Sequence, residues 1–266
     1  MRTTAIDRLD RYCYMSGRRY EFKYLLRPEL AERVVNFLAP YLEMDEHCRG
    51  SDTNTYTVRS IYFDSPDFEC FHEKLGGQKH REKFRIRTYN NPGSGPLFLE
   101  NKIKDGLSYV KDKVTLNADT LKAIKNLDYD SLSEVDRHDK DKRILDKFFF
   151  YIYRMAYSPV VLVVYDREAY VYPGQDTIRV TLDKNLRARM FPNLAQIYDE
   201  ERLEYLLYHW IILEIKFTDI LPRWMMPLTS LFYLKRQACS KYCTSVAHFI
   251  GEIPSFKDGL AYVRRI

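Results

Sequence analysis

Several short segments of this sequence place Lys and Arg at alternate positions. Lys83, Arg85 and Arg87 follow this spacing, and so do Lys111 and Lys113. In a β-strand, residues two apart point to the same side, so each segment would present a row of positive charge. Arg offers paired donors and Lys a compact charge, and together they suit an anion with many phosphates. The spacing therefore predicts a surface that binds polyphosphate or a nucleoside triphosphate.

Four acidic residues occupy the same charged rows. They are Glu21, Glu100, Asp183 and Glu214. One role is structural, namely to neutralise neighbouring bases. The other is functional, because divalent cations bind carboxylates and can bridge them to phosphate oxygens. The spacing of the acids leaves both roles open.

An amphipathic sheet with one face in water would explain any single charged row. Two features favour an enclosed face instead. Like charges at adjacent same-side positions repel each other, and the segments between the strands carry apolar stripes that need a sheet face to pack on. If helices cover the apolar face, the charged face becomes the inside of a closed sheet, as in barrels that enclose a ligand. We therefore expect an antiparallel β-barrel.

The hydrophobic pattern divides the chain into elements that would build this barrel. The expected strands cover residues 19–26, 53–64, 82–90, 97–104, 107–116, 160–172, 177–184 and 210–217. One helix is expected to begin at Pro28. Further helices are expected over 67–75, over two segments within 117–153, and over 222–249. Asp105 and Gly106 are expected to form a hairpin turn, and residues 185–208 an irregular segment. Residues 1–17 would be an N-terminal tail or arm, and 18–266 a single tunnel domain.

Composition limits the alternatives. The 22 Tyr and 15 Phe favour strands, and a formal net charge of +5 does not predict a nucleic-acid binder. Five Cys without a CxxC pair argue against a disulfide framework and a zinc site, which favours a reducing, cytoplasmic location. No secretory signal is visible, and the longest apolar runs are far shorter than the ~20 residues of a membrane span. No Gly-rich phosphate loop occurs, so a Rossmann or P-loop nucleotide fold is not expected.

The charged segments, taken in order, resemble the VTC domain, the polyphosphate polymerase domain of the triphosphate tunnel metalloenzyme (CYTH-like) superfamily. The resemblance covers residues 18–248, nearly the whole chain. The matching pieces are Glu21-Phe22-Lys23-Tyr24, Arg59-Ser60-Ile61-Tyr62-Phe63-Asp64, Arg85-Ile86-Arg87-Thr88-Tyr89, Leu99-Glu100-Asn101-Lys102, Arg179-Val180-Thr181-Leu182-Asp183, Leu213-Glu214-Ile215-Lys216 and Ser240-Lys241-Tyr242.

This resemblance implies an α+β fold, an antiparallel β-barrel tunnel with helices packed outside and a C-terminal helix at the tunnel mouth. Glu214 corresponds to the carboxylate that carries Mn²⁺ or Mg²⁺, with Glu21, Glu100 and Asp183 as further candidates. The residues expected to be catalytic are Lys23, Arg85, Arg87, Lys102 and Glu214. The residues expected to bind phosphate are Arg59, Lys113, Arg167, Arg179, Lys216 and Lys241.

The reaction implied by the resemblance moves the γ-phosphate of a nucleoside triphosphate, normally ATP, onto a growing polyphosphate chain. CYTH phosphatases and cyclases carry an ExExK strand, but here Arg19 stands at the first Glu position. A metal-dependent triphosphatase is therefore the second hypothesis. A non-catalytic polyphosphate-binding module, acting with a membrane protein, is the third. No SPX domain or membrane helix is visible, as in free-standing bacterial members, and no nucleic-acid partner is expected.

Overall fold

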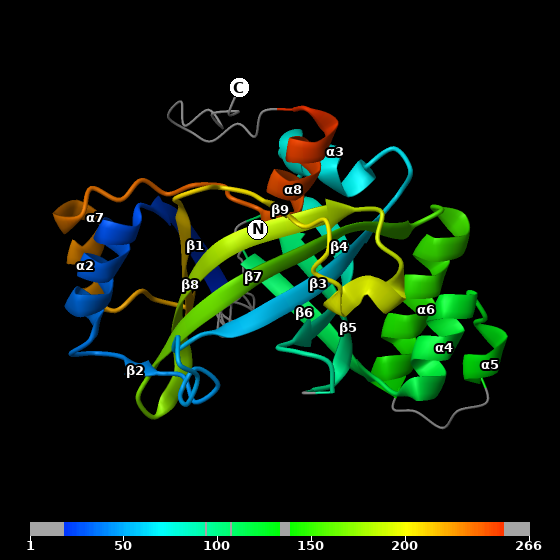
Figure 1. Ribbon diagram of the computed structural model, residues 1–266, viewed down its shortest axis with the longest axis horizontal. Coiled ribbons are helices and arrows are strands. Elements are labelled where there is room, and N and C mark those ends of the chain that lie inside the picture. Colours follow the sequence, from blue (N-terminus) through cyan, green and yellow to red (C-terminus); the bar gives the residue numbers. More distant parts are fainter. Residues whose placement is uncertain (1–18, 94, 107, 134–138, 253–266) are drawn as a thin grey trace, which may run out of the picture.

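The structure is a computed structural model, and it describes residues 19–93, 95–106, 108–133 and 139–252. Eight antiparallel strands close into a barrel (Figure 1). Their order around the barrel is β7-β3-β4-β5-β6-β1-β10-β8, and β8 pairs with β7 to complete the circle. The antiparallel barrel predicted from the charged rows is therefore confirmed. The expected N-terminal tail, residues 1–17, lies outside the described residues.

The strand bounds follow the predicted alternation closely. The barrel strands are β1 (Arg19–Leu26), β3 (Tyr56–Asp64), β4 (His80–Tyr89), β5 (Leu97–Asp105), β6 (Ser108–Leu116), β7 (Ser158–Tyr172), β8 (Gln175–Met190) and β10 (Ile211–Thr218). Two short strands, β2 (Glu43–Met44) and β9 (Glu204–Tyr205), extend the sheet beside β7 and β8.

The seam between β1 and β6 joins the two strands only near their first described residues. Arg19 and Tyr109 are the only register pair between these strands in the described part of the chain, whereas β1 pairs with β10 over eight residues. From this pair β1 continues past the start of β6 at Ser108. A later segment runs along the edge that β1 leaves open, where the Gln237 amide donates to the Lys23 carbonyl at 2.8 Å.

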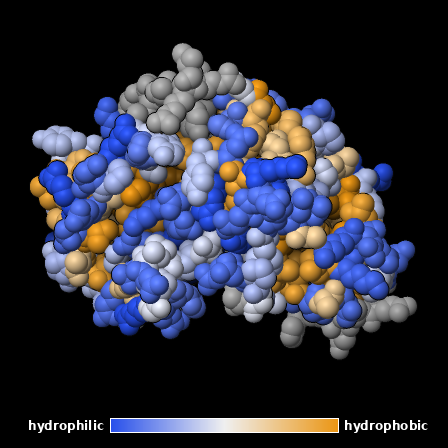
Figure 2. Space-filling view, viewed as in Figure 1, coloured by the Kyte–Doolittle hydropathy of each residue, from blue (hydrophilic) through white to orange (hydrophobic). Residues whose placement is uncertain are grey.

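Helices cover the outer, apolar face of the barrel. They are α2 (Pro28–Leu38), α3 (Glu69–Leu75), α4 (Ala118–Asn126), α5 (Asp130–Ser133), α6 (Asp139–Arg154), α7 (Pro227–Leu231) and α8 (Lys241–Ile250), with the 3₁₀ turns η1 (Leu194–Tyr198) and η2 (Arg223–Met225). Helices α2 and α7 lie at one end of Figure 1, and α4–α6 lie at the other. Hydrophobic side chains gather over both ends in Figure 2, and hydrophilic ones lie between them.

Two hydrophobic clusters join these helices to the barrel. Val34 and Leu38 of α2 pack in one cluster with Leu213 of β10. Phe148 of α6 packs in the other, where its ring contacts Phe63 and Phe84 at centroid distances of 5.0 and 5.5 Å. Apolar residues thus bury their surface outside the sheet, which leaves the inner face to the charged residues.

Three expectations about the elements were wrong. Strand β8 continues to Met190 rather than ending at residue 184, because Leu186 and Ala188 are buried and keep the alternation beyond the positive-φ residue Asn185. The helix expected over 222–249 is interrupted, because α7 ends at Leu231 and α8 begins only after the Ser240 N-cap.

The hairpin expected at Asp105-Gly106 is shifted by one residue. Asp105 pairs with Ser108 in the ladder between β5 and β6, so it belongs to the strand. Gly106 has φ +57°, a conformation that costs glycine little.

Within residues 19–252, less the short gaps, no helix is long and apolar enough to cross a membrane. Four of the five cysteines lie in the described residues, and Cys48, Cys70, Cys239 and Cys243 are free and buried there.

The packing of α6 predicts a large difference between two neighbouring phenylalanines. Phe148 is fully buried, whereas the Phe150 side chain is 56% exposed. We expect Phe148→Ala to lower the free energy of unfolding by about 3–5 kcal/mol, since it leaves a cavity among aromatic rings. Phe150→Ala is the matched control and should change it by less than about 1 kcal/mol. Chemical denaturation measures both, and equal losses would contradict the packing described.

Candidate functional site

The barrel encloses one strongly basic cavity of about 930 Å³. Its described lining includes twelve Lys and Arg side chains and two Glu, so positive charge is in large excess. The basic lining residues are Arg19, Lys23, Lys83, Arg85, Arg87, Lys102, Lys111, Lys113, Arg167, Arg179, Lys216 and Lys241. The two acidic residues are Glu21 and Glu214. Ligand cavities of this volume are common in proteins, but so basic a lining suits only a polyanion.

Strand alternation places most of the predicted site residues in the lining of this cavity. All the predicted bases except Arg59 line the cavity, as do Glu21 and Glu214. Glu100 and Asp183 are almost fully buried beside it and pair with the lining residues Arg85 and Arg167. The structure thus brings together thirteen of the fourteen predicted site residues, counting these two acids.

Arg59 is the exception, and its prediction as a phosphate-binding residue is corrected by the structure. Along β3, Tyr56 and Tyr62 line the cavity, so the odd-numbered Arg59 faces the other side of the sheet. There its guanidinium pairs with Glu200 and donates to the Asn90 carbonyl at 2.9 Å.

Glu214 is the centre of the densest charge cluster in the cavity. Its carboxylate lies within 4 Å of four cations, and only 3% of the residue is exposed. The distances from its oxygens are 3.1 Å to Lys23, 2.9 Å to Lys216, 2.6 Å to Lys241 and 3.4 Å to Arg167. Burial alone would raise the pKa of Glu214, but Lys216, Lys23 and Lys241 hold it well below its usual range.

Asp183 and Glu100 organise the bases on either side of this cluster. Arg167 grips Asp183 with two bonds of 2.6 and 2.8 Å, and Lys241 pairs with the same carboxylate. Glu100 accepts from Arg85 at 2.6 and 2.8 Å. Burial would raise the pKa of Glu100, but Arg85 and other nearby cations lower it far below its ordinary value. These acids fix the directions in which the guanidinium groups point.

Several lysines retain uncompensated charge despite the lining acids. Burial lowers the pKa of Lys102, Lys111 and Lys216, and the carboxylates beside them only partly offset this. Lys113 lies over the Phe98 ring at 3.5 Å from the centroid, and no carboxylate of the described chain forms an ion pair with it. An anion in the cavity would stabilise the charged form of each of these lysines.

Tyr62 and Tyr165 are lining residues that the sequence reasoning missed. Arg85 donates to the Tyr62 hydroxyl at 2.8 Å, and Arg87 donates to the Tyr165 hydroxyl at 3.3 Å. Burial would raise the pKa of Tyr62, but Arg85 and Arg87 lower it to about 8. The available signal was alternation, since Tyr165 stands two residues before Arg167 in β7.

The lining acids fit a divalent cation only when phosphate accompanies it. Among the described residues, no group of three or more Asp, Glu, His or Cys side chains is placed to hold a metal ion. Both Glu214 oxygens are engaged by ammonium or guanidinium groups. Magnesium sites that use one or two carboxylates take further ligands from substrate phosphates and water. Glu214 can supply one such carboxylate, with Glu21 and Asp183 near it.

Comparison with known proteins identifies the family. The profile of the VTC domain matches residues 18–250 of this chain. The chain belongs to the VTC domain family. Its structure is the antiparallel barrel that the strand motifs implied, with basic residues on the inside.

Curated relatives of this VTC domain are subunits of a larger complex. The chain is 22% identical over 186 residues to vacuolar transporter chaperone complex subunit 2 of Schizosaccharomyces pombe, and 25% identical over 144 residues to subunit 4 of the same species. These matches cover 63% and 48% of this chain. They cover only 25% and 20% of the relatives, so the chain spans a quarter or less of their length.

Two solved structures are similar over most of the chain. A putative adenylate cyclase from Bacillus halodurans aligns with a TM-score of 0.47 and 13% identity, covering 85% of this chain and 95% of that one. The capping enzyme triphosphatase of Mimivirus aligns with a TM-score of 0.33 and 9% identity, covering 86% and 96%. The family assignment rests on the profile match alone.

The pairing of Glu100 predicts a pH-dependent loss of stability in Glu100→Gln. Removing this buried charge leaves Arg85 and Lys111 without their shared counterion, which should cost about 3 kcal/mol or more of unfolding free energy. Because the folded pKa is depressed, this contribution is complete above the unfolded value of 4.5 and is lost as pH falls below it.

Denaturation of the wild type and the variant across a pH series measures this difference. The exposed Glu32→Gln on α2 is the matched control and should be near neutral. A gap between wild type and Glu100→Gln that is constant into acid would contradict the assigned charge pairing.

Proposed function

We propose that this VTC domain transfers the γ-phosphate of ATP, or of another nucleoside triphosphate, onto inorganic polyphosphate inside the barrel. The observation that supports it most strongly is the single cavity in which twelve bases surround one nearly buried glutamate. Phosphoryl transfer depends mainly on positioning and on neutralising phosphate charge, and the cavity is equipped for both. It requires no protein nucleophile.

In the proposed step, a terminal oxygen of the polyphosphate chain attacks the γ-phosphorus of the nucleotide. A new P–O bond forms as the bond to the β–γ bridging oxygen breaks, and ADP leaves with that oxygen. Arg85, Arg87 and Lys102 grip the triphosphate, and Lys23 neutralises charge beside Glu214. The remaining bases, Lys113, Arg167, Arg179, Lys216 and Lys241, bind phosphates of the donor and the polymer or orient the acids.

The proposed cofactor is Mn²⁺ or Mg²⁺, held by Glu214 together with phosphate oxygens, and Glu21 and Asp183 are the nearest further carboxylates. A cation held there would supply positive charge that stabilises the developing charge on the phosphate oxygens. Lys23, Lys216 and Lys241 occupy the Glu214 oxygens, so they must shift toward the incoming phosphates. Glu100 pairs with Arg85 and Lys111 instead, and it serves these bases as a counterion.

One geometric observation favours a polymerase over a triphosphatase of the same fold. Ser240, the N-cap of α8, borders both the barrel cavity and a second basic cavity, so the space for a longer anion extends beyond the interior on this side. A growing chain needs such space, whereas a hydrolase releases only small products. The relatives are subunits of a vacuolar transporter chaperone complex, so a membrane-associated partner is part of this proposal.

Incubation of the protein with ATP and Mn²⁺ or Mg²⁺ separates the candidate activities. Polyphosphate, resolved by gel electrophoresis, supports the transferase. Free phosphate without polymer would support a triphosphatase, and neither product would support a binding module.

Glu214→Ala should abolish polymer synthesis while polyphosphate binding is retained, because the bases are unchanged and the phosphates of the polymer replace the lost counterion. A rate of polymer synthesis equal to that of the wild type would contradict the proposed role of Glu214. Glu214→Gln, which keeps the shape of the side chain, guards against a loss caused by misfolding. Glu32→Ala on α2 is the surface control and should synthesise polymer at the wild-type rate. Thermal unfolding of each variant shows whether it is folded.

The lowered lysine pKa values predict that affinity for tripolyphosphate falls at alkaline pH. Burial lowers the pKa of Lys102 and Lys216 in the free protein, and bound phosphate would raise it again. Binding therefore takes up protons as pH rises past the lowered pKa values, and it weakens. Lys102→Arg keeps its charge, so its affinity should fall less steeply than that of the wild type when both are measured by calorimetry. Identical pH profiles would contradict this account.

A further inference from the structure

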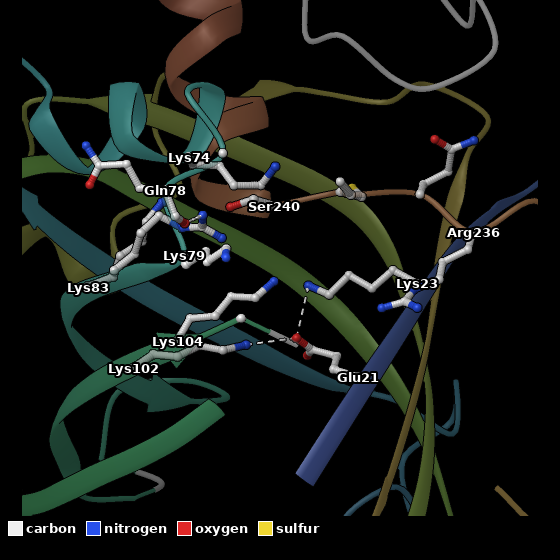
Figure 3. A pocket seen from close by; sticks show the side chains of 16 residues that line it. Glu21, Lys23, Lys74, Gln78, Lys79, Lys83, Lys102, Lys104, Arg236 and Ser240 are labelled. Carbon is white, nitrogen blue, oxygen red and sulfur yellow. Dashed lines mark hydrogen bonds and ion pairs between the residues drawn. The ribbon is translucent and has the colours of Figure 1, made fainter. Parts of the chain in front are cut away.

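A second cavity of about 750 Å³ opens beside the seam between β1 and β6. Figure 3 shows the amino groups of Lys23, Lys74 and Lys104 pointing into one common space. The walls come from four parts of the chain. These are β1, the turn from α3 into β4, the end of β5, and the segment 236–240 before α8. We call this space the seam cavity.

The lining of the seam cavity, like that of the barrel interior, carries a large excess of positive charge. Among its described residues are eight Lys and Arg side chains and a single acid, Glu21. The basic residues are Lys23, Lys74, Lys79, Arg81, Lys83, Lys102, Lys104 and Arg236. Among the described residues, no carboxylate forms an ion pair with Lys74, Lys79, Arg81 or Lys104. The interior bases largely share counterions, and these four do not.

Arg81 is the most informative of these residues because it is buried. Only 9% of it is exposed, and its described partner is the carbonyl of Gln78. Burial lowers the pKa of Lys74, and the charges of Arg81 and Lys83 contribute to this. Burial also lowers the pKa of Lys104, again with a contribution from Arg81. A buried cation is normally paired with an acid, so this cluster is arranged for an anion from outside the chain.

The seam cavity adjoins the barrel interior. Five residues line both spaces: Glu21, Lys23, Lys83, Lys102 and Ser240. At the boundary, Lys102 reaches from β5 to Glu21 on β1 at 2.8 Å, and Lys23 lies 3.8 Å from the same oxygen (Figure 3). Ser240 caps the ten-residue helix α8, whose positive N-terminal end therefore also faces this boundary.

The lining also indicates which kind of anion fits. No Phe, Tyr or Trp is among the described residues that line the seam cavity. Single-stranded nucleic acids and nucleotides bind largely by stacking their bases on aromatic side chains, so they are poor candidates. A linear chain of phosphates has only charge and oxygen acceptors to offer, and this lining supplies only the matching groups.

We propose that the seam cavity is a second binding site for polyphosphate, which holds the part of a long chain that extends beyond the barrel. This inference rests on the proposed function, because it takes the ligand of the barrel to be a phosphate polymer. It predicts that affinity depends on chain length. Tripolyphosphate fills only the barrel, whereas longer chains also contact Lys74, Lys79, Arg81 and Lys104.

The test compares tripolyphosphate with a medium-chain polyphosphate by calorimetry at several salt concentrations, without ATP. The variant is Lys74→Gln/Lys79→Gln/Lys104→Gln, whose three residues line only the seam cavity. Medium-chain affinity should fall by about tenfold or more, and the slope of log Kd against log salt should fall by about 2, through lost counterion release. Tripolyphosphate affinity should change by less than about twofold.

The matched control removes the same charge elsewhere. Lys122→Gln/Lys125→Gln/Lys140→Gln neutralises three exposed lysines of α4 and α6, and it should bind both ligands as the wild type does. Equal losses in the two triple variants, or an equal loss for short and long chains, would overturn the proposal. Because no turnover is measured, a domain that binds by length but makes no polymer would overturn only the proposed transferase function.

Discussion

The structure depends on keeping many like charges inside a closed sheet. Twelve bases in one cavity repel each other, and burial adds to the cost of each charge. The fold meets this constraint with a few acids placed where several bases can share them, as Glu214 is shared by Lys23, Lys216, Lys241 and Arg167. The apolar residues can then pack outside the barrel, where α2 and α6 cover them.

Because four bases share the Glu214 carboxylate, its oxygens are already occupied when the proposed ligands arrive. In the free protein it holds three lysines and an arginine in place, and its charge is needed for stability. In the proposed reaction, the same carboxylate would become a ligand of the cation, and the bases it held would turn toward the phosphates of the polymer. Counterions would then be exchanged rather than created, so the bound and free states could both be stable. Such an exchange would explain why so few acids suffice for so many bases.

Much of the site could be read from side-chain alternation, because a strand converts spacing in the sequence into a face of the sheet. Lys23, Arg85, Arg87, Lys102 and Glu214 all lie where that rule puts them. Arg59 also obeys the rule, which places it on the outer face, but its site role was predicted from a motif resemblance that carries no information about the face a residue occupies. The extension of β8 was missed because Asn185 interrupts the expected pattern with a positive φ. The seam cavity is formed where four parts of the chain meet, and no local pattern in any one of them encodes that meeting.

For the proposed polymer ligand, the seam also bears on how a chain would enter the barrel. The described contacts at the seam are one register pair between β1 and β6, the bond from the Gln237 amide to the Lys23 carbonyl, and the ion pair of Lys102 with Glu21. Every other junction of the barrel is a ladder of several pairs. A fully laddered barrel would accept a polymer only by an end, so the rate of entry would depend on how often chain ends meet it. A junction with few contacts would let the middle of a chain enter from the side, and entry would then no longer depend on chain ends.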